Sequence, residues 1–224
     1  RGGHTPTNAI PAGRTVGAVE DESLNRSARG ATVKVNTARL TTADIEGTNG
    51  VVHLIDGVML EGTDAVDRTT LTPQLSTLAS ALEAASLTGS DSPLRGDNLT
   101  IFAPLNSGFN GLDVGTLTND SEILNRVLQH HVISGSRLGS GQIESGESPE
   151  TLEGGTLDIQ ADGTVTVNGI PVSTTDVQTE NAVIHLIDGV LLERLDIAQR
   201  ASVSENLETL SSAVQAAGLD AEDS

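Results

Sequence analysis

The sequence has no cysteine, no tryptophan and no tyrosine, and it contains only two phenylalanines among 224 residues. Because cysteine is absent, the chain cannot form a disulfide bond, and thiol catalysis is excluded. A hydrophobic fraction of 36% is still enough to bury a core made mostly of Leu, Val, Ile and Ala. We therefore expect a folded chain that aliphatic packing stabilises.

Basic residues are also scarce. Lys and Arg number 12 against 31 Asp and Glu, which gives a formal net charge of −19. This charge repels nucleic acids and anionic lipid surfaces, and no basic tract opposes the repulsion. No apolar run approaches the length of about 18 residues that a membrane-spanning helix needs. The composition therefore predicts no nucleic-acid partner and no insertion into a membrane.

The common catalytic and cofactor motifs are missing as well. The sequence has no phosphate-binding glycine loop, no HExxH metal motif and no Gly-x-Ser-x-Gly nucleophile elbow. We therefore expect no catalytic residue, no cofactor and no metal centre, and the sequence does not predict an enzyme.

The sequence does contain an internal repeat. Residues 32–60 match residues 164–192 without a gap, and residues 75–87 match residues 207–219 at the same offset of 132. A single offset through both blocks indicates a repeating unit of 132 residues, the size of a small domain.

The phase of this repeat predicts three segments. We take the HLIDGV strand as the end of a unit and the LSTLASAL helix as its beginning. Residues 66–197 then form one complete unit, residues 1–65 the back part of a preceding unit, and residues 198–224 the opening helix of a following unit.

The complete unit begins with helical patterns. Apolar residues at helical spacing predict a helix over 73–87, with Thr72 as its N-cap. Residues 205–218 have apolar residues at the same helical spacing and predict an equivalent helix. Residues 121–131 place five side chains, His131 among them, on one apolar face and predict another helix.

Between these helices, the segment TIFAPLNSGF over 100–109 holds both phenylalanines. LTIFAP predicts a buried strand that ends at Pro104, because proline cannot donate a hydrogen bond to a sheet. Asn106 is expected to cap a short helix that contains Phe109. We predict that Phe102 and Phe109 serve the same packing centre as core anchors. The alternative is that the two rings bind an apolar ligand.

The rest of the unit is predicted to form strands. Alternating apolar residues and turn signals such as Asn168-Gly169 separate them. The predicted strands are 156–160, 164–167, 170–172 and 182–192. Helices come first and strands last, and this segregation predicts an α+β domain.

His185 lies in the last predicted strand, three residues before Asp188. Residues three apart in an extended strand face opposite sides, so the two cannot act as base and orienting acid without a bulge. We therefore expect His185 to be a hydrogen-bonded structural residue. Asp188 and Gly189 are expected to form a turn or bulge, with the glycine supplying an unusual backbone angle.

The adjacent residues His130 and His131 are also predicted to be structural. Their side chains diverge by about 100° on a helix, so they cannot chelate one metal as a pair. His131 continues the apolar face and is expected to be a core histidine with satisfied hydrogen bonds.

Clusters of acidic residues could hold Ca²⁺ weakly between chains. None has the spacing of an EF-hand loop, and a solvated acidic face is the default interpretation. The clusters are Glu144, Glu147 and Glu150, and Asp220, Glu222 and Asp223.

Four motifs of the complete unit resemble, in order and spacing, the successive motifs of the fasciclin-like domain. They are TIFAPLNSGF (100–109), LQHHVISG (128–135), TLEGGTLDIQADGTVTVNG (151–169) and VIHLIDGVLL (183–192). The resemblance implies a β-sandwich wedge packed against a group of helices. It also implies tandem repeats in a secreted or surface-anchored protein.

The chain departs from the family pattern at two places. The family usually has Thr where Leu105 stands, and a Tyr-His pair where His130 and His131 stand. The tyrosine of that pair is implicated in integrin-type adhesion in animal members, and this chain has histidine in its place.

The leading functional interpretation is an extracellular or cell-surface protein that adheres to other surface or matrix proteins or to copies of itself. Its support is the repeat together with the family resemblance. Two alternatives stay open, a carrier of a small apolar ligand and a subunit of a self-assembling filament. The filament alternative follows from the phase of the repeat, because incomplete units expose apolar faces that need a partner.

Overall fold

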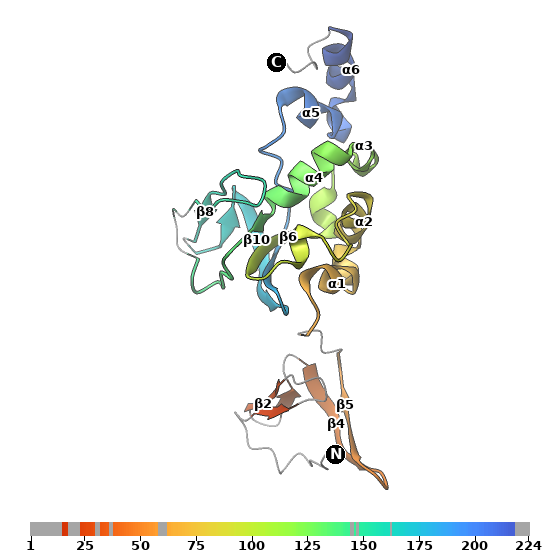
Figure 1. Cartoon of the computed structure of the whole chain (residues 1–224), viewed down its shortest axis with the longest axis vertical. Coiled ribbons are helices and arrows are strands. Elements are labelled where there is room, and N and C mark those ends of the chain that lie inside the picture. Colours follow the sequence, from red (N-terminus) through yellow and green to blue (C-terminus); the bar gives the residue numbers. More distant parts are fainter. Residues whose placement is uncertain are drawn as a thin grey trace. The chain divides into compact units, whose positions relative to one another are not determined.

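The structure is a computed structural model that describes residues 15–17, 23–29, 32–35, 38–57, 62–143, 146, 148–161 and 163–217. Its contacts divide the chain into two compact units, Arg1–Gly62 and Thr63–Ser224 (Figure 1). None of the helices in the described ranges has the length and apolar character to cross a bilayer. The three segments that the repeat defines, 1–65, 66–197 and 198–224, stay a prediction.

The first unit contains a five-stranded antiparallel sheet in which the strands follow sequence order. The strands are β1 (Thr15–Gly17), β2 (Ser23–Arg29), β3 (Thr32–Val35), β4 (Ala38–Glu46) and β5 (Val51–Ile55). Two irregularities interrupt the pairing of β4 with β5, one on either side of Thr42. The strand pair is therefore bulged along its length.

The second unit is built on a six-stranded sheet in the order β7-β6-β11-β10-β9-β8. Its strands are β6 (Leu99–Pro104), β7 (Val132–Ile133), β8 (Ile159–Gln160), β9 (Thr166–Val167), β10 (Ile170–Gln178) and β11 (Ala182–Ile187). The central pair β6 and β11 is parallel, and the other pairs are antiparallel. Every residue of β11 is buried, as expected for a parallel strand that is covered on both faces.

Short helices make up the rest of the second unit, and in Figure 1 the helices α1 to α4 gather on one side of β6 and β10. The α-helices are α1 (Ala65–Thr70), α2 (Ser76–Ala84), α3 (Val114–Asn119), α4 (Ser121–His130), α5 (Ile197–Ser202) and α6 (Glu208–Ala216). The 3₁₀ turns are η2 (Pro73–Leu75), η3 (Pro93–Arg95), η4 (Asn106–Phe109) and η5 (Glu205–Leu207). The predicted α+β class is confirmed.

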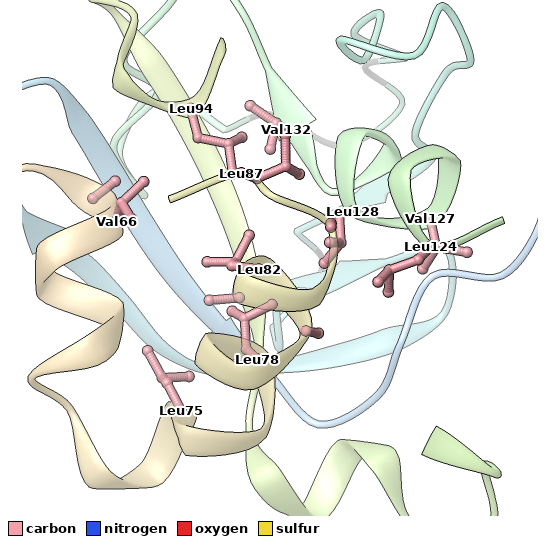
Figure 2. Close-up of a cluster of buried hydrophobic side chains, with 14 of the residues drawn as sticks. Val66, Leu75, Leu78, Leu82, Leu87, Leu94, Leu124, Val127, Leu128 and Val132 are labelled. Carbon is pink, nitrogen blue, oxygen red and sulfur yellow. The ribbon is translucent and has the colours of Figure 1, made fainter. Parts of the chain in front are cut away.

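Two hydrophobic clusters lie in this unit. The helix-side cluster joins the helices to the sheet, and Figure 2 shows Leu78 and Leu82 of α2 in it together with Leu124 and Leu128 of α4. The strand-side cluster contains Phe102 and takes further side chains from β7 at one end of the sheet and from β8 and β9 at the other. The sheet must therefore curl around the strand-side cluster.

The periodic pattern of the sequence does not predict three short helices, because each contains only six residues. These are α1, α3 and α5. Their N-caps are Asp64, Asp113 and Asp196, and each carboxylate accepts a hydrogen bond from a backbone N–H in the first turn. An aspartate before a short apolar segment was the available signal for all three.

Asn181, in the turn before β11, connects three segments of the second unit. Its Oδ1 accepts a hydrogen bond from the Ala65 N–H at 2.9 Å, and its Nδ2 donates to the carbonyls of Leu94 and Gly96 at 3.0 Å. The side chain is buried, so each of these backbone groups would lose its partner if the amide were removed.

We predict that Asn181→Ala lowers the free energy of unfolding by about 3 kcal/mol, because it leaves several buried polar groups unpaired. Asn49 occupies the equivalent position of the first unit and is exposed, so Asn49→Ala is the matched control and should change stability by less than about 0.5 kcal/mol. Urea unfolding followed by far-ultraviolet circular dichroism measures both. Equal effects of the two substitutions would contradict the anchoring role of Asn181.

Candidate functional site

The centre of the second unit is a stacked pair of rings, Phe102 of β6 and His185 of β11. The parallel register places the two residues opposite each other. Their ring centroids lie 5.4 Å apart at an interplanar angle of 26°, and both side chains are fully buried. The Phe102 ring therefore covers one face of the His185 ring and excludes water from that face.

Both ring nitrogens of His185 are hydrogen-bonded. Nε2 donates to the Leu138 carbonyl at 2.8 Å, and Nδ1 accepts from the Asp176 N–H at 3.4 Å. Burial lowers the pKa of His185 below its ordinary value, so the ring is neutral at neutral pH. Asp188 is exposed, and its backbone N–H donates to the Pro171 carbonyl at 3.1 Å. No hydrogen bond joins the two side chains, and His185 has no free nitrogen to act as a base.

Asp176 is the partner of His185 that the sequence analysis missed. Its backbone is left-handed, with φ of 62°, and its carboxylate accepts hydrogen bonds from the backbone N–H and the hydroxyl of Ser140. In the first unit, Asp44 has φ of 55° and donates its N–H to His53 Nδ1 at 3.1 Å. An aspartate nine residues before the histidine in both repeat copies was the signal for this motif.

His131 ends helix α4 and joins it to the segment after β11. Its Nδ1 donates to the Val127 carbonyl at 2.7 Å, and its Nε2 accepts from the Leu191 N–H at 2.9 Å. Burial lowers the pKa of His131 to about 4. The ring is therefore a neutral connector.

His130 is equally buried but less well paired. Its Nδ1 lies 3.3 Å from Thr151 Oγ1, and its Nε2 has no hydrogen-bond partner in the described part of the chain. Glu193 approaches Nε2 at 3.9 Å and Glu153 approaches Nδ1 at 3.8 Å. Burial lowers the pKa of His130, and Glu193 opposes the shift. A fully buried ring cannot itself contact a partner protein.

The predicted role of Asn106 as the cap of its own short helix is wrong. Asn106 is the first residue of η4, and its side chain reaches to α2, where Oδ1 accepts from the Thr77 N–H at 3.0 Å. Its Nδ2 donates to the Pro73 carbonyl and to Ser76 Oγ. Thr72, the predicted cap, makes no capping hydrogen bond, and the first turn is the 3₁₀ turn η2. The Thr77 N–H, in the first turn of α2, is thus satisfied by a residue from another segment.

The prediction that Phe102 and Phe109 serve one packing centre is also wrong. Phe102 belongs to the strand-side cluster, whereas Phe109 belongs to the helix-side cluster. The chain leaves β6 at Pro104, which pairs with Ile187, and η4 then turns toward the helices. The two rings therefore pack into different clusters.

Gly189 does not supply an unusual backbone angle, because its φ is not in the left-handed region. The absence of a side chain at Gly189 allows neighbouring segments to approach it closely. A Cβ at Gly189 would lie 3.0 Å from the Ile170 side chain, and a Cβ at Gly108 would lie 2.9 Å from the Gly189 nitrogen. The turn after β6 and the turn after β11 thus touch through two glycines.

Of the acidic clusters, Glu144 and Glu147, and also Asp220, Glu222 and Asp223, lie outside the described residues. Glu150 is exposed. Within the described ranges, no three histidine, aspartate or glutamate side chains are grouped in a way that could hold a metal ion.

The cavities of the second unit differ in character. A small apolar cavity of about 20 Å³ lies in the helix-side cluster, bordered by Leu78, Phe102 and His131. Two open, more polar grooves lie at the surface. One, of about 380 Å³, is lined by Leu105, Asn106 and Ser107 with residues of β10 and β11. The other, of about 420 Å³, is lined by Ser134 and residues 150–154.

We predict that Gly108→Ala lowers the free energy of unfolding by about 1–3 kcal/mol, because the new methyl group meets backbone atoms of Gly189 that cannot move aside. Gly89→Ala is the control. A Cβ at Gly89 has no atom within 4 Å, so this change should be neutral or stabilising by up to about 1 kcal/mol. Urea unfolding compares the two. A neutral Gly108→Ala would show that the two turns can separate at no cost.

We also predict that acid destabilises the fold through His131. The pKa is about 4 in the folded state and about 6.5 in the unfolded state, so only the unfolded state binds the proton between these values. Stability is complete above about pH 6.5 and falls by about 3 kcal/mol as the pH falls to 4. NMR titration of the histidine C2 protons, assigned with His131→Gln, measures the midpoint. A midpoint near 6.5 would contradict the burial argument.

Comparison with known proteins places the chain in a family. The family model described as fasciclin domain matches residues 2–61 and 73–193. Transforming growth factor-beta-induced protein ig-h3 of Sus scrofa is 39% identical over 167 residues, which cover 71% of this chain and 24% of that relative. Periostin of Homo sapiens is 37% identical over 166 residues, covering 71% of this chain and 20% of the relative. The chain thus spans about a quarter or less of the length of these relatives.

Two further matches extend the comparison. The cell surface glycolipoprotein MPB83 of Mycobacterium bovis is 35% identical over 131 residues, which cover 54% of this chain and 56% of that relative. A solved FAS1 domain pair from the insect cell adhesion molecule fasciclin I shares the fold, with a TM-score of 0.53 at 21% identity. That alignment covers 76% of this chain and 67% of the solved chain. Since the family model matches most of the sequence in two segments, this chain belongs to the fasciclin domain family.

Proposed function

We propose that the chain is an adhesion or matrix protein that acts outside the cell or at its surface through protein–protein contacts. The observation that carries the proposal is the match of the fasciclin domain to two successive segments of the chain. One relative bears the name of a cell surface glycolipoprotein, and the solved neighbour in fold comes from a cell adhesion molecule. Function is thus inferred from the family, because the fold alone does not determine it.

The hydrogen bonds of His131 and His185 support a non-enzymatic role for these two residues. His131 and His185 are buried, and both ring nitrogens of each are hydrogen-bonded within the protein. A general base needs a free nitrogen within reach of a substrate proton. Neither ring can therefore exchange protons with a substrate unless the fold opens.

The interior of the second unit does not favour the carrier alternative. The apolar cavity beside Phe102 has a volume of about 20 Å³, which is close to the space of a single water. A pocket that encloses a small organic ligand has a volume of about 300–1,000 Å³. We therefore do not propose that the two phenylalanines hold an apolar ligand.

We propose the groove formed by Ser134 and residues 150–154 as the contact surface. It is open, and Thr151 and Glu153 of its lining contact the buried His130. The resemblance places the Tyr-His pair of the family at His130 and His131. Because His130 is buried, a partner protein would meet the lining of this groove in place of the ring. Glu150 is exposed there and offers a negative charge to a basic side chain.

Adhesion can be measured on a surface coated with the full chain, by counting the cells of the source organism that stay bound under flow. We expect Glu150→Arg to reduce the number of retained cells about five-fold, which corresponds to about 1 kcal/mol of contact energy. Glu83→Arg is the matched control, since Glu83 is exposed on α2 away from the groove and the charge change is the same. Retention no greater than on an albumin-coated surface would refute the adhesive function, and equal retention by both variants would refute the groove.

A further inference from the structure

His130, at the end of α4, is a fully buried histidine whose hydrogen bonds are incomplete. Its Nε2 has no hydrogen-bond partner among the described residues, whereas His131 and His185 use both ring nitrogens. A buried polar atom in a folded protein nearly always has a partner, so an unpaired one needs an explanation. The ring contacts the groove loop, which we define as residues 150–155 and which lines the proposed contact groove.

The hydrogen bonds of Thr151 determine which ring nitrogen of His130 carries the hydrogen. The Thr151 hydroxyl donates to the Gly155 carbonyl at 3.1 Å, so toward His130 Nδ1, at 3.3 Å, it acts as an acceptor. We therefore assign the hydrogen of the neutral ring to Nδ1, which leaves a lone pair on Nε2. The Nε2 atom lies 3.9 Å from the carboxylate of Glu193, whose negative charge attracts a proton to it.

Charged groups lie on both sides of the His130 ring. Glu153 of the groove loop approaches Nδ1 at 3.8 Å and donor Arg194 holds this carboxylate at 2.9 Å, while Glu193 lies on the Nε2 side. The other titratable group beside the ring is the neutral His131 of the same segment. Burial lowers the pKa of His130, and Glu193 and Glu153 limit the shift. The ring is thus neutral at neutral pH and takes up a proton only below about pH 6.5.

The groove loop packs closely against the His130 ring. A Cβ at Gly155 would lie 2.9 Å from His130 Cε1 and 3.0 Å from Arg194 Cδ, so no side chain fits there unless the ring is displaced. The loop is itself a tight turn, in which the Thr151 N–H donates to the Gly155 carbonyl at 2.7 Å and the Gly154 N–H donates to the Thr151 carbonyl at 2.9 Å. A new charge on the ring therefore acts on the lining of the groove at contact distance.

We propose that His130 is a proton-binding site that makes the groove release its partner in acid. The proton binds Nε2, and the imidazolium then lies between the carboxylates of Glu153 and Glu193. One positive charge is thereby added beneath a groove that offers the negative charge of Glu150 to a basic partner. Like charges repel, so the partner is held less tightly when His130 is protonated. The effect on adhesion rests on the proposed function, whereas the proton-binding site does not.

The burial of the ring sets the direction of the pH dependence. Because the pKa of His130 in the folded state lies below its ordinary value of about 6.5, the contact is strongest above this pH and weakens as the pH falls through the folded-state pKa. By linkage, a basic partner in the groove lowers the pKa of His130 further. The resemblance places a tyrosine of the family at this position, and tyrosine, with an ordinary pKa of about 10, is uncharged in this range. Histidine therefore gives this chain a pH response that tyrosine cannot supply.

NMR titration of the full chain tests the proton-binding site without any partner. We expect the histidine C2 signal that is lost in His130→Tyr to titrate below about pH 6.5, and the amide signals of Glu153 and Gly154 to shift with the same midpoint. Glu193→Gln should lower this midpoint by about 0.5 pH unit, because it removes a carboxylate that favours the charged ring. Glu83→Gln, an exposed position on α2, is the matched control and should not change it. A His130 signal that stays neutral until the chain unfolds, a midpoint that Glu193→Gln leaves unchanged, or loop amides that follow another midpoint would each overturn the site.

Retention of cells under flow on the full chain, at about pH 7.5 and about pH 5.5, tests whether the proton weakens the contact. We expect retention to fall about three-fold at the lower pH, while far-ultraviolet circular dichroism shows that the chain stays folded. The fall should disappear in both His130→Tyr and His130→Gln, two replacements of different size, and persist in the matched control His53→Gln. Equal retention at both pH values, or the same fall in both His130 variants, would refute the coupling. Retention no greater than on albumin at either pH would refute the adhesive function instead, and the NMR titration would still decide the proton-binding site.

Discussion

The parallel pairing of β6 with β11 is the constraint on which the second unit depends. It joins two segments that are far apart in sequence and buries both, so every polar side chain on them needs a partner inside the protein. Thr100 of β6 donates to the Ser136 carbonyl and accepts from the Leu138 N–H. His185 of β11 donates to the Leu138 carbonyl. The two central strands therefore fix the segment that follows β7.

Buried and half-buried polar side chains organise the remaining segments in the same manner. Asn106 connects the end of β6 to α2, Asn181 connects the start of β11 to α1, and His131 connects α4 to the segment after β11. In each case a side chain pairs with backbone groups that their own helix or strand cannot satisfy. A fold with such short helices gains little from helix propensity, so these specific contacts set where each helix lies.

The sequence predicts features that depend on one segment and misses those that depend on two. The periodic pattern is sufficient for the α+β class and for the end of β6 at Pro104. It cannot show that Phe102 and Phe109 enter different clusters, because periodicity gives the buried side of an element but not the partner. The cap that Asn106 supplies to α2 and the contact of Gly108 with Gly189 are likewise contacts between distant segments.

The repeat provides two copies of one strand pair, β4–β5 and β10–β11. Comparing them distinguishes the features that the strand pair itself determines from those that its surroundings determine. In β4–β5 and in β10–β11 the pairing shifts at equivalent residues, and Asp44 and Asp176 both adopt a left-handed backbone next to a histidine. The surroundings differ, because His185 is fully buried whereas the His53 side chain is 27% exposed. The bulge is present in both surroundings, so it is a property of the strand pair itself. The full burial of His185 is a property of the second unit, in which both hydrophobic clusters include residues of β11.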